Sequence, residues 1–227
     1  LKKEVSRPKN SLVGKFDKRS LTDAFETYKA PQADQRVVQI VRPFSVSSKA
    51  SYSAPVTLPI GPAYLAAVLE KSLYNVEIID GVGEDIFQIK RSDCGLYNVQ
   101  DLTTEQIIGC LNPRSSVIGV SLMFSQEWLL HRDLIIAIRK SFPDATIVVG
   151  GEHVTSLPEY VLRDCPAIDF AITGEGDLTF LHLVHNIHCD EATDAVPGCS
   201  YIDAAGNFVS NQLSLRIEAI DELPRPA

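Results

Sequence analysis

The chain has 227 residues, 45% of them hydrophobic, which suits one medium-sized globular domain with additional segments. Its 29 acidic and 21 basic residues give a formal net charge of −8, which argues against a nucleic-acid-binding surface, because neutralising phosphates requires clustered Lys and Arg. No apolar run approaches the roughly 20 residues needed to cross a bilayer and the amino terminus lacks a signal-peptide core, so we expect no membrane partner and a cytoplasmic location.

Residues 1–34 are polar and mixed in charge, and 20–32 have the spacing of one short helix, so we predict an arm that packs on the main domain or on a neighbour. From residue 36 onward, apolar runs typical of buried strands alternate with helical periodicities. The predicted strands are 36–41, 76–80, 116–123, 145–151 and 168–173. The predicted helices are 62–72, 102–111 (capped by Thr103 or Thr104), 128–142, 156–164 and 178–188.

Five strands alternating with helices predict an α/β fold of the doubly wound, Rossmann-like or flavodoxin-like type, with a five-stranded parallel sheet covered on both faces. After residue 194 the pattern changes. Residues 196–211 predict a β-hairpin appendage, and the last residues form a polar, proline-containing linker. We therefore expect an arm over 1–34, the main domain over 35–194, and a hairpin with a linker over 195–227.

The five cysteines are irregularly spaced, and neither CxxC nor CxxxCxxC occurs, so the sequence carries no zinc or iron–sulfur signature. We interpret them as reduced thiols. The histidines of the predicted helices, His131, His182, His185 and His188, are most simply solvent-facing, and we assign no metal ligand and no catalytic residue. Glu175 and Asp177 precede or begin a helix, where the helix dipole favours acidic side chains.

In an open parallel sheet, ligands bind beyond the carboxyl ends of the strands. The segment after the first strand is long and polar, and such loops are usually functional or disordered. Glycine pairs follow two other strands, Gly150–Gly151 and Gly174–Gly176, where a large ligand can approach the backbone and the next helix offers free N–H groups. His153 lies in one of these loops and is a candidate site residue. Tight βα turns are the simpler explanation of either pair alone, but two such pairs at the ligand-binding edge of the fold favour a site.

Several segments, in order, resemble the cobalamin-binding domains that precede radical S-adenosylmethionine domains. LPIGPAYLAAVLE (58–70) is similar to that family's PPLGLAYLAAYL segment, and three later stretches match its third-, fourth- and fifth-strand segments: VIGVSLMFS, IVVGGEHVTSLPEYVL and IDFAITGEGDLTFLHLV. VPGCSYIDAAGNFVSN and IDELPRPA resemble the link into the radical domain. The likeness runs from about Val37 to Ala227, and it is the ordered set, rather than any one motif, that is specific.

The resemblance implies cobalamin over the carboxyl edge of the sheet. Ser121 and Met123 match a Ser-x-Leu element that contacts the nucleotide tail, with Met in place of Leu, and Gly150 and Gly151 match the Gly-Gly element that lets the tail pass. The implied cofactor-binding residues are Arg42, Pro59, Gly61, Ser121, Met123, Phe124, Gly150, Gly151, His153, Val154, Gly174, Glu175 and Gly176.

One departure concerns the cobalt. The DxHxxG motif, by which some cobalamin proteins supply a lower-ligand histidine, is replaced here by Arg42-Pro43-Phe44-Ser45. The radical-enzyme branch generally lacks this motif. Arg42 is the residue that we would inspect first for a role near the metal.

The resemblance also implies a function for a longer parent protein. We expect a radical domain in cis, beyond Ala227, with the CxxxCxxC loop that holds the iron–sulfur cluster and cleaves S-adenosylmethionine. The parent is then a methyltransferase acting on an unactivated carbon or phosphorus centre, and this chain is its cobalamin module. The alternatives are a stand-alone cobalamin-binding sensor, a doubly wound enzyme with another nucleotide cofactor, which the absence of GxGxxG disfavours, and a domain that has lost its ligand.

Overall fold

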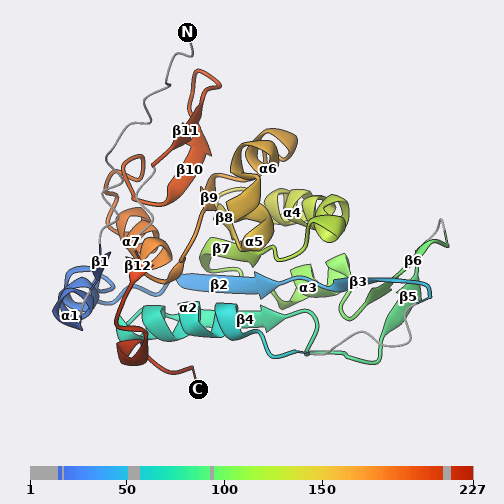
Figure 1. Ribbon diagram of the computed structural model, residues 1–227, viewed down its shortest axis with the longest axis horizontal. Helices are drawn as coiled ribbons and strands as arrows, with labels where there is room; N and C mark the ends of the chain where they lie inside the picture. The colour runs from blue at the N-terminus through green and yellow to red at the C-terminus, as the bar shows by residue number, and fades with distance from the viewer. Residues whose placement is uncertain (1–14, 17, 51–56, 93–94, 212–215, 227) are drawn as a thin grey trace, which may run out of the picture.

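The structure is a computed structural model that describes residues 15–16, 18–50, 57–92, 95–211 and 216–226. Its centre is a seven-stranded sheet in the spatial order β11-β10-β9-β8-β7-β2-β4 (Figure 1). Five neighbouring strands are parallel: β4 (Val76–Asp80), β2 (Val37–Arg42), β7 (Ser115–Ser121), β8 (Thr146–Gly150) and β9 (Phe170–Ile172). Along the chain these are the first five strands of the sheet, in the order 2-1-3-4-5 that is typical of flavodoxin-like folds.

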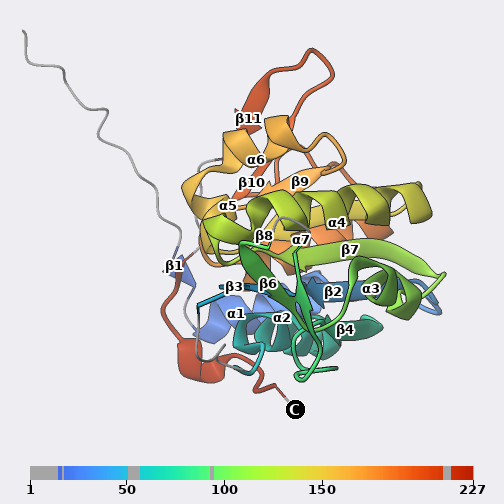
Figure 2. The same ribbon diagram turned by 90° about the vertical axis from the view of Figure 1, so that its right-hand side faces the viewer.

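Helices cover both faces of the sheet, and each face has its own apolar core. On one face, α1 (Lys18–Thr27), α2 (Ile60–Lys71) and α7 (Asp177–His188) pack against inward residues such as Val38 and Val148. On the other, α3 (Thr104–Cys110), α4 (Trp128–Ser141), α5 (Glu152–Ser156) and α6 (Pro158–Asp164) pack against residues such as Val41 and Ile147. The strands read as continuous Val and Ile because both of their faces are buried. In Figure 2, α4 lies in front of the sheet and α2 behind it.

The predicted fold class is confirmed, and most predicted elements appear within two residues of their expected bounds. The hairpin strands β10 (Cys199–Ile202) and β11 (Phe208–Ser210) extend the central sheet in antiparallel fashion, since β10 pairs with β9. The predicted helix 156–164 is α6, with Pro158 in its first turn as expected. The short helix α5 before it was not predicted, and it ends at Ser156 because Pro158 has no N–H to continue it. Thr103 caps α3 in a capping box with Gln106, as predicted.

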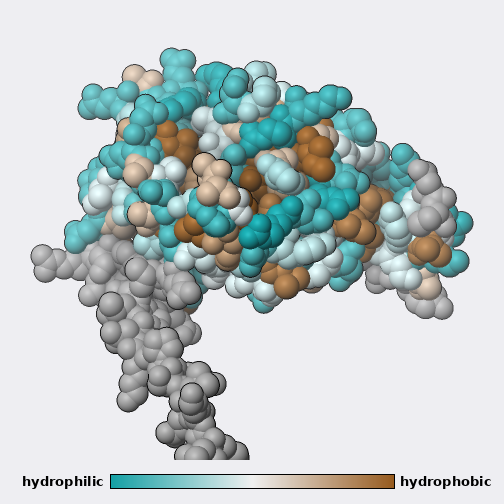
Figure 3. Space-filling model, turned by 90° about the horizontal axis from the view of Figure 1, so that it is seen from above, coloured by the Kyte–Doolittle hydropathy of each residue, from teal (hydrophilic) through white to brown (hydrophobic). Residues whose placement is uncertain are grey.

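A second, three-stranded antiparallel sheet was not predicted. It consists of β3 (Ser45–Ser48), β6 (Tyr97–Gln100) and β5 (Ile89–Arg91), and it stands beyond the carboxyl end of β2 (Figure 1). The short strands β1 (Lys15–Phe16) and β12 (Arg216–Ile217) pair with each other, and single turns of 3-10 helix occur at Ser125–Glu127 and Ile220–Glu222. In Figure 3, hydrophobic patches are scattered among hydrophilic residues, one of them at the end of the molecule that holds the small sheet.

Two of the helix histidines correct the interpretation of them as solvent-facing. His131 and His188 are only 2% and 4% exposed, because α4 and α7 turn these rings toward the sheet. The prediction was wrong because a residue's place in a helix does not by itself reveal which side of the helix faces the sheet. Among the described residues, no helix combines the length and apolar character that crossing a bilayer requires.

Candidate functional site

The parallel strands place the predicted site at one edge of the sheet. β2 and β7 are neighbours, but the chain leads from β2 to β4 on one side and from β7 to β8 on the other, which makes their carboxyl ends the topological switch point. Arg42 ends β2 beside Asp80 of β4, and Ser121 ends β7 beside Gly150 of β8. The sequence therefore brings residues from four separate segments to a common edge.

The loops after β7 and β8 are joined by backbone hydrogen bonds. The Leu122 N–H donates to the Gly150 carbonyl (2.7 Å), and the His153 N–H donates to the Leu122 carbonyl (3.2 Å). Gly151 lies between them with φ +113°, and a Cβ there would approach the Leu122 carbonyl oxygen to 2.4 Å. Both the backbone conformation and the close approach require glycine at this position. This pairing gives the predicted Gly150–Gly151 element a defined place against the Ser121–Phe124 loop.

At three other glycines the absence of a side chain leaves the backbone open, with no atom closer than ordinary van der Waals contact to the Cβ position. A Cβ on Gly61, in the first turn of α2, would meet nothing within 4 Å. A Cβ on Gly150 would make only ordinary contact with Ile172 at 3.8 Å, and one on Gly176, the N-cap of α7, would lie 3.6 Å from Leu65 of α2. A Cβ on Gly176 would also lie 3.7 Å from Ile172, the last residue of β9, so α7 begins at the end of that strand. The first turns of α2 and α7 each carry N–H groups without intrahelical partners.

His153 supplies a polar group that the protein itself does not satisfy. The residue is 3% exposed, its Nδ1 lies 2.9 Å from the Ser125 hydroxyl, and its ring centroid is 5.2 Å from that of Trp128. Burial lowers the pKa of this imidazole, so the neutral form is favoured. Among the described residues its Nε2 is buried without a hydrogen-bond partner. Such an orphaned atom beside the glycine loops is what a polar ligand group would satisfy.

Arg42 holds the loop that leads from β2 to α2. Its guanidinium lies 3.3 Å from the Asp80 carboxylate and donates to the Thr57 hydroxyl (3.1 Å) and to the Thr57 carbonyl. These contacts fix the residues just before Pro59, the N-cap of α2. The structure thus gives Arg42 a positioning role, and its expected role near the metal stays a prediction.

Exposed apolar side chains surround this edge. Leu58 and Ile60 on either side of Pro59 are 81% and 62% exposed, and Met123 and Phe124 are 53% and 55% exposed. Single exposed apolar residues are ordinary, but four in two loops that flank a switch point mark a surface suited to a large, partly apolar ligand.

The remaining predicted residues have structural partners. Val154 is fully buried in the core, so it supports the loop from beneath. Gly174 adopts φ +76° and its N–H donates to the Thr155 hydroxyl (3.0 Å), whereas the Glu175 carboxylate accepts from the Ile217 N–H (2.7 Å) and is directed toward β12. Burial raises the pKa of Asp177 at the start of α7. The sequence did not single out Ser125 or Leu65 as site residues; the available signals were the position of Ser125 in the loop after β7 and that of Leu65 in the second turn of α2.

Comparison with known proteins bears directly on this edge. The B12 binding domain family matches residues 51–184, which is more than half of the chain and includes the ends of β7, β8 and β9. The chain belongs to the B12-binding domain family. It is a cobalamin-binding domain, and the predicted cofactor is confirmed at the level of the family, while the individual contact residues stay predictions.

The chain is also similar to curated proteins named as methyltransferases. The chain is 30% identical over 169 residues to an uncharacterized methyltransferase of Pyrococcus horikoshii, covering 74% of the chain and 33% of the relative. It is 30% identical over 154 residues to cytidylyl-2-hydroxyethylphosphonate methyltransferase of Streptomyces wedmorensis, covering 66% of the chain and 28% of the relative. The chain thus spans a third or less of the length of these relatives.

Two solved structures share the fold. The cobalamin-dependent S-adenosylmethionine radical enzyme OxsB, with aqua-cobalamin and S-adenosylmethionine bound, superposes with a TM-score of 0.64 at 23% identity over 91% of this chain and 25% of its own. The radical S-adenosylmethionine methyltransferase TsrM from Kitasatospora setae, with cobalamin and a [4Fe-4S] cluster bound, superposes with a TM-score of 0.57 at 21% identity. The match covers 78% of this chain and 31% of TsrM.

The residues at the carboxyl edge fit cobalamin. The cofactor is large, so it needs backbone that is free of side chains, and the glycines at 61, 150 and 176 provide it. It also carries amide and hydroxyl groups, which can satisfy the orphaned His153 Nε2. When bound, cobalamin supplies the redox and alkyl-transfer chemistry of its cobalt, and the protein supplies binding and orientation.

Proposed function

We propose that this chain is the cobalamin-holding module of a radical S-adenosylmethionine methyltransferase that modifies an unactivated carbon or phosphorus centre. The module belongs to a longer protein whose radical domain, in cis beyond Ala227, binds the iron–sulfur cluster and S-adenosylmethionine. The membership in the B12-binding family, with curated relatives named as methyltransferases, carries this proposal. Among the described residues, Cys110, Cys165, Cys189 and Cys199 are unpaired, which supports a reducing, cytoplasmic location.

In this proposal the chain's own residues bind and orient. Gly150, Gly61 and Gly176 admit the ligand to the backbone, and the first turns of α2 and α7 offer it N–H groups. The neutral His153 ring presents Nε2, with its orientation fixed by the Ser125 hydroxyl on Nδ1. Arg42 anchors the loop before α2 so that the exposed Leu58 and Ile60 stay beside the site.

Binding at this edge is tested by incubating the chain with hydroxocobalamin, desalting it, and recording the corrin absorption that it retains. Gly150→Leu should reduce retention more than about tenfold with the melting temperature little changed. A Cβ at 150 is tolerated at 3.8 Å, whereas the further carbons occupy the surface assigned to the ligand. Gly109→Leu is the matched control, because Gly109 lies on the exposed side of α3 and a Cβ there meets nothing within 4 Å. Equal retention by the two variants would place the cofactor elsewhere.

The methyltransferase part of the proposal has a separate test. The reading frame beyond Ala227 should encode a CxxxCxxC segment, and the protein containing it should bind an iron–sulfur cluster. A stop codon directly after Ala227 would instead support the stand-alone cobalamin sensor and overturn the proposed activity without affecting the cobalamin site.

A further inference from the structure

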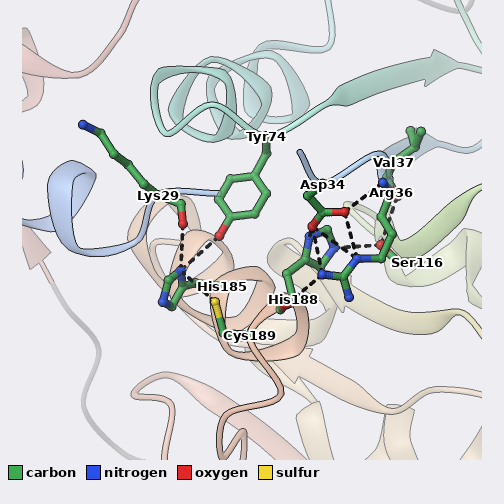
Figure 4. Close-up of polar contacts among 9 residues, drawn as sticks. All are labelled: Lys29, Asp34, Arg36, Val37, Tyr74, Ser116, His185, His188 and Cys189. Carbon is green, nitrogen blue, oxygen red and sulfur yellow. Dashed lines mark hydrogen bonds and ion pairs between the residues drawn. The ribbon is translucent and has the colours of Figure 1, made fainter. Parts of the chain in front are cut away.

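A second cluster of polar side chains lies at the opposite, amino-terminal edge of the sheet. Helix α7 starts at the cobalamin edge and ends beside Val37, the first residue of β2, and Ser116, the second residue of β7 (Figure 4). In its last turn His185 and Cys189 are four residues apart and therefore on the same side of the helix. Glu191 follows two residues later, and Tyr74 approaches from the turn between α2 and β4.

The donor atoms of this cluster have the spacing of a coordination shell. The ligand atoms of His185, Cys189 and Glu191 all lie within 4.8 Å of one another. His185 Nδ1 is 3.9 Å from Cys189 Sγ, 3.2 Å from the Lys29 carbonyl oxygen and 3.1 Å from the Tyr74 hydroxyl (Figure 4). A tetrahedral zinc ion, with Zn–N near 2.0 Å and Zn–S near 2.3 Å, separates its ligand atoms by about 3.3–3.6 Å. Small side-chain adjustments bring these atoms to that geometry.

Without a cation these groups compete for one ring nitrogen. Nδ1 either donates a proton to the Lys29 carbonyl or accepts one from the Tyr74 hydroxyl or the Cys189 thiol, so it can serve only one of them at a time. A metal that binds the Cys189 sulfur displaces the thiol proton. A cation held by the thiolate, the imidazole and the carboxylate would satisfy all three groups together.

The local electrostatics favour a cation. Cys189 is the C-cap of α7, where the helix dipole presents its negative end, and Asp190 and Glu191 add two carboxylates. The neighbouring positive group, Arg36, is paired with Asp34 at 2.8 Å. Asp34 also faces His188, whose Nδ1 is 2.8 Å away and whose Nε2 lies 2.7 Å from the Ser116 hydroxyl. That adjacent network uses its own groups and leaves His185 and Cys189 outside it.

We propose that His185, Cys189 and Glu191 form a binding site for one thiophilic divalent cation, Zn²⁺ by ligand type, with the Lys29 carbonyl oxygen available for a fourth position. Binding releases the thiol proton to solvent and involves no change of oxidation state. Because Lys29 lies two residues after the end of α1, the metal would fasten α1 to the end of α7 at the edge opposite the cobalamin site. The site does not depend on the proposed function.

The test uses the whole chain, stripped with a chelator and desalted. Titration with Zn²⁺ should leave one equivalent bound after a second desalting, and Co²⁺ in its place should give a thiolate-to-cobalt charge-transfer absorption. Cys189→Ser should abolish that absorption and weaken Zn²⁺ binding more than about tenfold, since loss even of an outer partner costs 10–100-fold. Cys110→Ser, which removes an exposed thiol on α3, should behave as the parent chain.

A second variant distinguishes a loss of zinc binding from a loss of folding. Glu191 is exposed, so Glu191→Gln should leave the metal-free melting temperature unchanged while weakening Zn²⁺ binding about tenfold. Zn²⁺ should raise the melting temperature of the parent chain and of Cys110→Ser, but not that of Cys189→Ser. The proposal is wrong if the parent retains no zinc at micromolar concentrations, or if Cys189→Ser and Cys110→Ser bind it equally.

Discussion

At the scale of single residues, buried polar groups fix the loop that leads from the sheet to the cofactor edge. His131 on α4 is 2% exposed, and its Nε2 donates to the Phe44 carbonyl at 2.9 Å, two residues beyond the end of β2. Because the side chain is almost wholly desolvated, burial lowers its pKa to about 4, and the ring is neutral at pH 7. The neutral imidazole thus holds the backbone at Phe44, where the chain leaves β2 after Arg42.

The lowered pKa of His131 makes stability depend on pH. The unfolded imidazole binds a proton near pH 6.5 and the folded one only near pH 4, so its contribution is complete above pH 6.5 and is lost as the pH falls toward 4. The loss amounts to about 3 kcal/mol. His131→Gln, which keeps an N–H donor but does not titrate, should remove this part of the pH dependence. Urea unfolding of both proteins at pH 7 and pH 4 measures it, and parallel losses of stability in the two would contradict it.

How far the site could be predicted differs from residue to residue. Gly151 was identifiable because a glycine pair after a strand indicates close backbone approach, and its φ of +113° agrees. His153 was identifiable from its loop. The partners that give these residues their roles, Ser125 for His153 and Thr57 for Arg42, were not, because hydrogen bonds between loops depend on side-chain directions that no local pattern encodes. For the same reason the sequence did not show that His131 and His188 are buried.

At the scale of elements, two carboxylates hold β3 of the small sheet, Glu127 from the start of α4 and Asp101 from the end of β6. Glu127 is 6% exposed and accepts from the Val46 N–H of β3 at 2.9 Å, while Asp101 accepts from the Ser45 hydroxyl at 2.9 Å. Burial raises the pKa of both carboxyls, which shows that the fold places them in sites that are costly for a charge. Each of these carboxyl groups accepts a hydrogen bond from β3 and so helps to hold that strand in place.

We expect Glu127→Ala to loosen β3 without unfolding the domain. The variant leaves the Val46 N–H without its acceptor, which costs about 1–3 kcal/mol locally. Amide hydrogen exchange at Val46 and at its β6 partner Val99 should accelerate at least fivefold, with exchange in β7 and β8 unchanged. Glu127→Gln keeps an acceptor oxygen and should exchange as the parent does. Uniform acceleration across the central sheet in Glu127→Ala would show instead that the carboxylate supports the whole core.

The two sheets also explain which elements sequence patterns could predict. The central strands are buried on both faces and carry continuous apolar runs, so their positions were predicted closely. β3, β5 and β6 read SVSS, IKR and YNVQ, and their side chains are half-buried or exposed. They are held by pairing and by contacts with Asp101 and Glu127, so no local periodicity distinguishes them from a loop. The five-residue helix α5 was likewise not predicted, whereas the start of α6 was, because Pro158 is typical of a first helical turn.

At the scale of the whole molecule, α7 runs from the edge of the sheet assigned to cobalamin to the edge that carries the proposed cation site. Its first turn borders the glycine-lined surface assigned to cobalamin, and its last turn carries the proposed cation site some eleven residues later. Within the segment predicted as an arm over 1–34, helix α1 and the residues after it lie at the second edge, because α1 packs beside the end of α7 and Tyr28 stacks on His182 with ring centroids 4.4 Å apart (Figure 1). Structural support and cofactor binding are therefore expected to be separable along the chain.

A chain that begins at Asp34 tests this separation and the boundary predicted there. Removal of α1 uncovers the pocket of Leu21 and Phe25, which are 1% and 7% exposed, and should lower the free energy of unfolding by about 3–6 kcal/mol. Corrin retention at saturating hydroxocobalamin should be unchanged below the unfolding temperature, because the site residues lie at the other edge. Urea unfolding and absorption after desalting measure the two effects, with Leu21→Ala in the full chain as a control for lost packing alone. If stability is preserved, α1 is a dispensable arm; if corrin is lost from a folded, shortened chain, the amino-terminal segment contributes to the cofactor site.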